Sequence, residues 1–514
     1  MNKKVRILLT LALSTSILAT GCGSTRDQAG SEKTFTYGTM AYGPAMENVG
    51  TNPHDTYVGW STLRYGIGET LFRFTENMQL EPWLARDYEQ LDDYTVKIRL
   101  KDNITFSNGK KVTGQAVKAC LDDLLEKNDR APEDLKIDSI TADDDSITIK
   151  SKEKVPALLN YLSDPYGCII DVEAGEHDHI VVGTGPYLPV SVSDTEIILK
   201  KNENYWGDVK PKMDKIIVKS IPDGDTLTMA MQNGEFDAVQ GLPYASLSLF
   251  QGKDTYKISQ TDTSRVYQIA FNYRTPALQD LRVCKAIAMA IDKENFTKVL
   301  LHGQGTPAAG PFPAALPFGG TTVKAAPYDL DGARALLKEA GYEDTDGDGY
   351  VDKDGKDLEL RYLTYTSRQE LPLLAESAQD SLKKIGIKLD INATDNYKPF
   401  RKNGEFDLYA NAIVTAPTGD PEYYFTTHLL KASPYNFGCY QSDKMEALEE
   451  QLRNTYGAEN RAKIAIQMEQ LALDDCAYIY AAHLRMSFVM RKGVEGFTAH
   501  PSDYYEIRPE LDKE

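Results

Sequence analysis

Histidine is the first residue type in this chain whose chemistry points to a task. A neutral imidazole is a good ligand for nickel, zinc or cobalt. His54 lies in the segment Thr51-Asn52-Pro53-His54-Asp55, and His483 follows the apolar residues 477–482. We take both as candidate metal ligands, with simple packing in the core as the alternative. His177 and His179 are also spaced as ligands, but their polar surroundings are more typical of a surface loop.

An acidic loop is the second candidate metal site. Asp344, Asp346, Asp348 and Asp352 place oxygen donors at the spacing of a calcium loop. Position twelve of such a loop is Gly355, where an EF-hand needs a glutamate. Since Asp-Gly is also a strong turn signal, we favour a hairpin over a calcium site.

Catalytic motifs are missing from the sequence. It contains no HExxH, no GxSxG, no GxxxxGK[ST] and no glycine-rich dinucleotide fingerprint. Carboxylate pairs are plentiful, but in a chain with a net charge of −19 they are typical of a solvated surface. We therefore predict that the protein is not an enzyme, holds no prosthetic group and binds no nucleic acid.

The N-terminus reads as an export signal. Lys3, Lys4 and Arg6 precede an apolar run at residues 7–18 that is too short to span a bilayer. The run ends at Ala19-Thr20-Gly21-Cys22, which resembles a lipobox, although Ala19 stands where that pattern prefers leucine. We predict a signal peptide at 1–21, a lipid on Cys22, a tether at 22–33 and an extracytoplasmic, membrane-anchored protein; plain secretion is the alternative.

The five other cysteines are widely spaced, odd in number and include no CxxC pair. They therefore predict neither a disulfide scaffold nor a zinc ribbon. One disulfide and buried free thiols both remain open.

Hydrophobic periodicity predicts an α/β protein. Alternating strands are expected at residues 95–100, 146–150, 196–200 and 215–218. Helical faces recur at 283–291, 371–385 and 461–473, and Gly386 ends the second of these helices before a strand at 387–391. The length exceeds what one core usually serves, and no linker-like run divides it. We expect lobes that the chain crosses more than once.

Several segments together resemble one known family. They are Gly68-Glu69-Thr70-Leu71-Phe72, Ile104-Thr105-Phe106-Ser107-Asn108-Gly109, Gly183-Thr184-Gly185-Pro186-Tyr187, Asn202-Glu203-Asn204-Tyr205-Trp206-Gly207, and residues 281–292. In this order and spacing they resemble the extracellular solute-binding proteins of ABC importers, family 5, which serve oligopeptides, dipeptides and nickel.

The resemblance implies a two-lobed α/β fold of the periplasmic-binding-protein type. Lobe I would hold residues 34–268 with an extra subdomain at about 70–190, and lobe II residues 269–484. Residues 485–514 would return to lobe I, with hinge crossings near 268–272 and 484–489. The implied partners are the permease and ATPase subunits of the importer, and we expect a monomer. The same resemblance implies that a ligand bound between the two lobes stabilises their closed arrangement.

Within the family, four segments resemble the nickel and metallophore branch: residues 60–71, 305–319, 365–372 and 415–421. This implies a ligand of nickel, or zinc or cobalt, already chelated by histidine or an opine-type metallophore. The rival is a di- or oligopeptide, because Asp420-Pro421 also resembles the element that holds a peptide's α-amino group. A nickel-binding relative can carry a histidine after Asp-Pro, whereas this chain has Glu422.

The predicted ligand contacts are mostly arginines, whose planar forks suit the carboxylates of a chelator. Arg130 resembles a relative's carboxylate-clamping arginine, with a surface loop as the alternative. The other candidates are Arg64, Arg368 and Asp420, and as aromatic walls Trp60, Tyr423 and Tyr424.

Overall fold

The computed structural model describes residues 32–40, 50–55 and 58–514. The predicted signal peptide, Cys22 and nearly all of the tether lie outside the described residues. Within the described part, no helix combines the length and the apolar character that crossing a bilayer requires.

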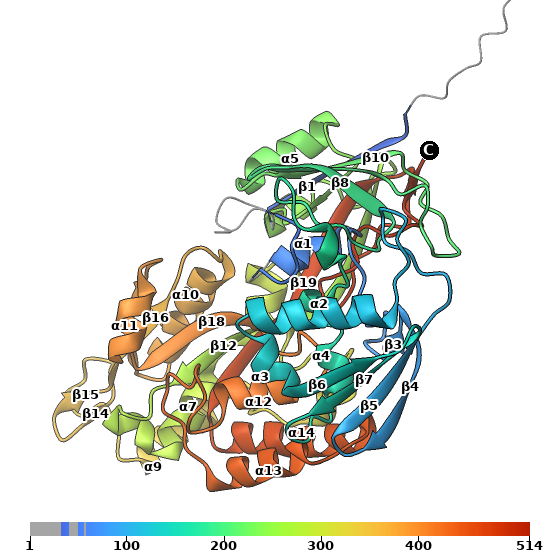
Figure 1. Cartoon of the computed structure of the whole chain (residues 1–514). Coiled ribbons are helices and arrows are strands. Elements are labelled where there is room, and N and C mark those ends of the chain that lie inside the picture. Colours follow the sequence, from blue (N-terminus) through green and yellow to red (C-terminus); the bar gives the residue numbers. More distant parts are fainter. Residues whose placement is uncertain (1–31, 41–49, 56–57) are drawn as a thin grey trace, which may run out of the picture. The chain divides into compact units, whose positions relative to one another are not determined.

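One mixed sheet of eleven strands organises the chain from Lys33 to Glu514 (Figure 1). Its order is β17-β16-β18-β12-β19-β11-β1-β10-β9-β8, with β13 also paired to β19. The first half-sheet comprises β1 (Thr34–Thr39), β8 (Tyr187–Val192), β9 (Glu196–Lys201), β10 (Lys215–Ser220) and β11 (Ala238–Gln240). The second half-sheet comprises β16 (Glu359–Thr364), β17 (Lys388–Ala393) and β18 (Leu408–Val414). The strands predicted at residues 196–200, 215–218 and 387–391 are confirmed in this sheet.

Two long strands, β12 (Tyr256–Phe271) and β19 (Tyr478–Arg491), join the half-sheets. They pair antiparallel from Tyr256 opposite Arg491 to Ala270 opposite Tyr478, with an irregularity between Asp262 and Val266. The first half-sheet pairs with β19 at residues 488–490, and the second with β12 at 265–271. The passage between halves therefore lies near 262–266 and 483–487. The expected crossing at 268–272 falls within the β12–β18 pairing, and the lobe boundaries stay a prediction.

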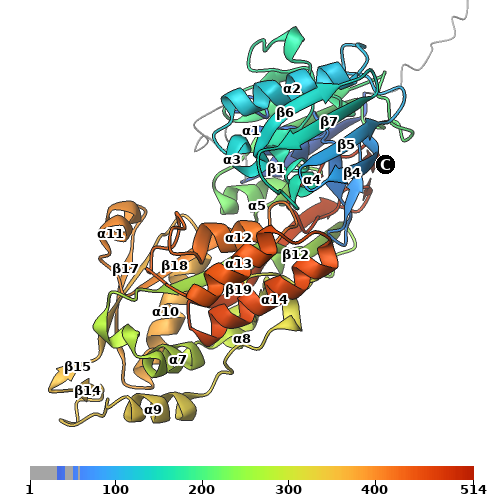
Figure 2. The ribbon, with the colours of Figure 1, turned by 60° about the horizontal axis from the view of Figure 1, so that its bottom comes forward.

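Helices cover both faces of the second half-sheet (Figure 2). Along β12, Tyr267 and Ile269 join a core with α7 (Leu281–Ala290), α9 (Leu330–Glu339) and α10 (Glu370–Lys383). Val266 and Ala270 join another core with α12 (Glu422–His428), α13 (Asp443–Arg453) and α14 (Ala458–Asp474). This alternation is what a strand buried on both faces requires. The predicted helical faces are confirmed.

A separate four-stranded antiparallel sheet has the order β4-β5-β7-β6. Its strands are β4 (Ala85–Asp92), β5 (Thr95–Leu100), β6 (Ile137–Ala142) and β7 (Ser146–Ser151). Alternate residues such as Val96, Ile98 and Leu100 are buried against α2 (Gly114–Lys127), whose N-cap is Thr113. The short helices α3 (Ala131–Leu135) and α4 (Leu158–Tyr161) complete this unit.

The remaining helices and strands are short. They are α1 (Val58–Arg64), α5 (Gly224–Asn233), α6 (Tyr244–Leu247), α8 (Lys293–Asn295), α11 (Tyr397–Asn403), β2 (Phe72–Phe74), β3 (Leu80–Pro82), β13 (Gly305–Pro307), β14 (Asp352–Lys353), β15 (Lys356–Asp357), β20 (Val494–Glu495) and β21 (Asp512–Lys513).

Candidate ligand-binding site

Two arginines next to the second half-sheet, Arg265 of β12 and Arg368 before α10, form the centre of the candidate site. Arg265 begins the pairing of β12 with β18, and Arg368 lies just before α10. Both are half-buried, and neither side chain has an ion pair or hydrogen bond among the described residues. Burial and the neighbouring positive charge of Arg368 lower the pKa of Arg265. Two cations held together without a paired carboxylate suit an anionic ligand.

The strand positions Arg265 by alternation. It lies on the same face of β12 as Tyr267, two residues on, and opposite to Val266. Tyr365 is close enough to interact electrostatically with both Arg265 and Arg368. Glu370 is the nearby counter-charge; its Oε1 accepts a hydrogen bond from Tyr244 Oη at 2.5 Å. Even with Glu370 counted, the two arginines leave positive charge in excess.

Arg64, in contrast, holds the structure together. Its Nε and Nη2 donate to the backbone carbonyl of Asp503 at 3.1 and 2.9 Å. It also forms ion pairs with Asp503 Oδ2 at 3.0 Å and Glu506 Oε1 at 3.2 Å. Burial raises the pKa of Glu506 to about 8, although Arg64 opposes this. The structure therefore assigns Arg64 to the contact between α1 and the C-terminal segment.

Trp60 and Tyr504 lie beside this contact. The Trp60 ring centre is 6.0 Å from the Arg64 guanidinium carbon and 6.4 Å from the Tyr504 ring centre. Asp503 acts electrostatically on Arg265, which connects this corner with the arginine pair. Trp60, half-buried, is thus placed close to the candidate site.

Arg130 stands among carboxylates. Its Nη2 lies 3.0 Å from Asp164 Oδ2 and 3.4 Å from Asp134 Oδ2, and its guanidinium carbon is 5.3 Å from the Tyr166 ring centre. Asp164, with the smaller contribution of Asp134, raises the pKa of Arg130. Burial raises the pKa of Asp134 to about 6. The side chain is 38% exposed, so it can reach a ligand, but its charge is already matched by two acids.

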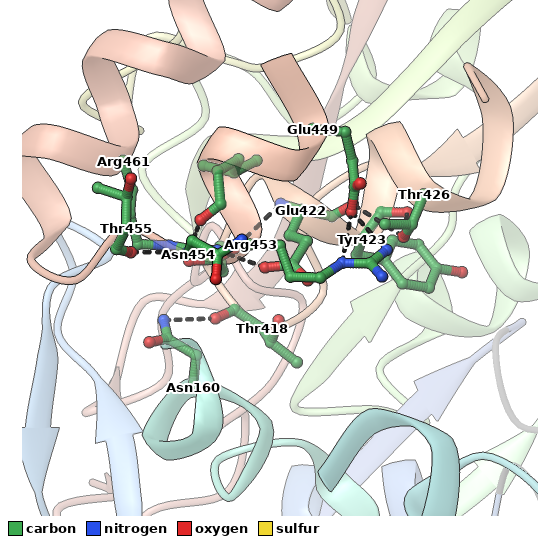
Figure 3. A network of polar contacts seen from close by, with 12 residues as sticks. Asn160, Thr418, Glu422, Tyr423, Thr426, Glu449, Arg453, Asn454, Thr455 and Arg461 are labelled. Carbon is green, nitrogen blue, oxygen red and sulfur yellow. Dashed lines mark hydrogen bonds and ion pairs between the residues drawn. The ribbon is translucent and has the colours of Figure 1, made fainter. Parts of the chain in front are cut away.

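Asp420 forms a buried ion pair with Arg461, whose second partner Glu422 is labelled in Figure 3. Arg461 donates from Nε to Asp420 Oδ2 at 2.8 Å and from Nη2 to Asp420 Oδ1 at 2.7 Å. The same Nη2 reaches Glu422 Oε2 at 2.7 Å, and the Glu422 amide donates to Asp420 Oδ1 at 3.0 Å. Nearby, Asn160 of α4 donates to the carbonyl of Thr418 at 2.9 Å. Asp420 thus fixes the loop before α12.

The two predicted aromatic walls of α12 differ. Tyr424 is fully buried, and its Oη bonds to Gln268 Oε1 at 2.9 Å and Tyr480 Oη at 2.8 Å, so it belongs to the core. Tyr423 is half-buried and interacts electrostatically with Arg130. Burial raises its pKa to about 12. The structure brings Tyr423, but not Tyr424, next to a predicted ligand contact.

Neither predicted metal ligand joins the arginine pair. His54 is fully buried, with Nδ1 2.7 Å from Asp123 Oδ2, and burial lowers its pKa. His483 lies opposite Val266 in β19, so its side chain is on the face away from Arg265. Burial lowers the pKa of His483 to about 4, and neither ring nitrogen has a described partner. A role for either as a ligand stays a prediction.

The remaining motifs lie elsewhere. Asp344, Asp346 and Asp348 are exposed, with carboxylate oxygens within 4.8 Å of one another, and the bridge between Glu343 and Asp352 closes the hairpin that we predicted. The five described cysteines are free thiols. A cavity of about 330 Å³ lies between β2, β3 and the C-terminal segment, lined by residues such as Glu69, Trp83 and Arg508. None of the predicted contacts lines it.

Comparison with known proteins gives the family. Residues 79–436 match the model of bacterial extracellular solute-binding proteins, family 5 Middle. The nickel-binding protein NikA of Staphylococcus aureus is 28% identical over 458 residues, which cover 88% of this chain and 90% of the relative.

Two solved structures are also similar. The nickel ABC transporter from Bacillus halodurans has a TM-score of 0.81 at 29% identity, and NikA from Staphylococcus aureus in complex with Ni(L-His)2 has 0.76 at 26%. Each match covers 94% of this chain and 100% of the other. The chain belongs to the bacterial extracellular solute-binding proteins of family 5 and has their two-lobed α/β fold.

Proposed function

We propose that this protein is the solute receptor of an ABC importer and captures a transition metal already bound to a small chelator. Nickel with histidine or an opine-type metallophore is the first candidate, and zinc or cobalt are the alternatives. The nickel-binding relatives support the metal. In this role the protein binds and releases its ligand without changing it, and hands it to the permease and ATPase subunits.

The observation that carries the proposal is the arginine pair. Arg265 and Arg368 lie together with no described ion pair, and burial strengthens their attraction for an anion. A chelator derived from amino acids offers carboxylates, which arginine binds with two parallel hydrogen bonds. Trp60 adds flat apolar surface beside Tyr504, and Tyr423 adds it near Arg130.

The chelator, rather than the protein, supplies the donors to the metal. His483 points away from Arg265, and His54 is enclosed by Asp123 and Cys120. Glu422, which follows Asp-Pro, is held by Arg461. A chelate that satisfies the metal by itself fits this arrangement.

The peptide alternative depends on Asp420, and the ion pair weakens it. Both oxygens of that carboxylate accept from Arg461, and Oδ1 also accepts from the Glu422 amide. A peptide α-ammonium group would have to displace a buried arginine, which leaves Arg461 without its partner and costs several kcal/mol, roughly 3–5.

Native mass spectrometry of the purified protein with Ni2+ and L-histidine tests the proposal. We expect a nickel-bearing adduct on the parent protein and its loss in Arg368→Gln. A ladder of peptide masses on the protein, with no nickel adduct, would establish the peptide receptor instead.

The anchor is tested separately. We propose that Cys22 carries a lipid and that the tether keeps the anchor independent of the binding site. Cys22→Ala is expected to move the protein from the membrane to the soluble fraction while nickel–histidine affinity stays the same. A variant that stays on the membrane would rule out the lipobox.

A further inference from the structure

The arginines of the candidate site and the acids around them form two clusters of opposite net charge. Arg265 and Arg368 leave positive charge in excess, while Arg130 is outnumbered by Asp134 and Asp164. We propose that the ligand has two electrical ends, with carboxylates held by Arg265 and Arg368 and a cationic or N–H-donating group held by Asp134. This inference rests on the proposed function and narrows its ligand to a dipolar chelate.

The acidic end is built around α3. Asp134 Oδ2 accepts from Tyr166 Oη at 3.2 Å and from Arg130 Nη2 at 3.4 Å. Among the described residues, no side chain donates to its Oδ1, and the side chain is 22% exposed, so this oxygen can accept from a ligand. Asp164 is 2% exposed, so it contributes to this end through its ion pair with Arg130 and not by direct contact with a ligand.

The negative charge continues across to α12. Tyr161 of α4 interacts electrostatically with Glu422, Asp420 and Asp134. Arg461 is the single cation paired with the two acids Asp420 and Glu422. Arg130 is likewise the single cation paired with Asp134 and Asp164. Each trio carries one negative charge in excess when its acids are ionised. Tyr423 faces this region, and its hydroxyl is a further acceptor.

In this proposal the two ends serve one ligand, because electrostatic and aromatic contacts connect them. Tyr504 interacts electrostatically with Asp164 and Arg130 and also with Asp503 and Arg64. Asp503 in turn acts on Arg265. Trp60 packs beside Tyr504, with ring centres 6.4 Å apart. Tyr504 is therefore coupled to charged groups of both ends, with Trp60 packed beside it.

This arrangement favours ligands whose negative and positive groups lie at opposite ends. A ligand with carboxylates alone gains at the arginine pair and is repelled by Asp134. A chelate with an imidazole or amine N–H at its far end gains at both, because a coordinated metal makes those N–H groups better donors. Discrimination by repulsion as well as attraction is a common route to specificity.

Calorimetry with two nickel complexes tests the inference. Ni2+ with L-histidine has carboxylates and N–H donors, while Ni2+ with citrate has carboxylates without N–H donors. The ratio of their affinities, measured by competition, is expected to favour histidine at least tenfold in the parent. Asp134→Asn is expected to reduce this ratio about tenfold, and Arg368→Gln to weaken both complexes.

Asp129→Asn is the matched control, because Asp129 is exposed and adjacent to Arg130 in sequence. It removes the same charge and is expected to leave the ratio unchanged. An unchanged ratio in an Asp134→Asn variant that is folded and unfolds cooperatively overturns the inference.

The design also separates this inference from the proposed function. If the parent binds neither nickel complex, the proposed function fails. The ratio of affinities is then measured with metal-free L-histidine and citrate. Its change in Asp134→Asn tests whether the site has two oppositely charged ends. A protein that binds none of these four overturns both.

Discussion

Two sets of arginines in this molecule have opposite surroundings. Arg461, 4% exposed, is paired with Asp420 and Glu422, and Arg64 is paired with Asp503 and Glu506. Arg265 and Arg368 act electrostatically on each other, and neither has a described ion pair. In our proposal, the same residue type therefore stabilises the fold in one region and binds an anion in the other. The partners, rather than the arginine, decide between these roles.

The difference also has an energetic side. A buried charge with a complete set of partners loses stability when one partner is removed. A pair of like charges lowers the stability of the fold and is retained where function needs it. Removing an arginine should therefore have opposite effects on the fold in the two regions.

The largest effect is expected at Arg461. Arg461→Met leaves Asp420 and Glu422 buried without their counter-charge and should lower the free energy of unfolding by about 3–5 kcal/mol. Urea denaturation measures this. Arg334→Met is the control, since Arg334 is 49% exposed and its partner Asp331 is 95% exposed, so their pairing contributes at most about 1 kcal/mol. Equal losses in both variants would remove the distinction between them.

The next effect is on binding at Arg368. Arg368→Gln should weaken the nickel–histidine complex by about 2–4 kcal/mol, the usual cost of truncating one partner of a desolvated charged contact. Isothermal calorimetry measures it. Arg334→Gln removes the same charge from an exposed helix position and should not change the affinity. If the parent and Arg368→Gln bind equally, the arginine pair is not the anion site.

A smaller effect concerns pH. Burial raises the pKa of Asp134 to about 6, so the folded protein keeps a proton that the unfolded chain loses near 4. The stability contributed by this group is therefore present below about pH 4 and lost as the pH rises to 6. The loss should be about 1–3 kcal/mol.

The variant Asp134→Asn should lack this pH-dependent contribution to the free energy of unfolding. Urea denaturation at pH 4, 5.5 and 7 should show the stability of the parent falling relative to the variant as the pH rises. Glu506, whose pKa is raised to about 8 by burial, titrates in both proteins and cancels in the difference. A constant difference across this range would contradict the prediction.

Much of the fold could be predicted from the sequence, because its signals are local. Alternation located the strands Thr95–Leu100 and Glu196–Lys201, and the helical face before Gly386 located α10. The Asp-Gly turns located the hairpin that Glu343 and Asp352 close. Each of these depends on residues within about twenty positions of one another.

The site was less predictable, because pairing between distant residues is not visible in the sequence. Arg461 lies 41 residues from Asp420 in the sequence and forms an ion pair with it. Arg265 was missed, since it follows the polar residues 259–264 and looks like a solvated position until its neighbours are known. Its position before the core residues Val266 and Tyr267 was the one available signal, because a charge there must face a neighbouring element.

The smallest predicted effect is at Arg265, and it tests the comparison by its sign. Arg265→Gln removes one of two neighbouring positive charges without a described ion pair to break, so it should raise the free energy of unfolding by about 0.5–1 kcal/mol. Arg265→Lys keeps the charge and should show no gain. High salt screens the repulsion in the parent, so the gain should shrink in 1 M NaCl. If Arg265→Gln is less stable than the parent at both salt concentrations, the side chain supports the fold as Arg461 does, and the contrast between the two regions disappears.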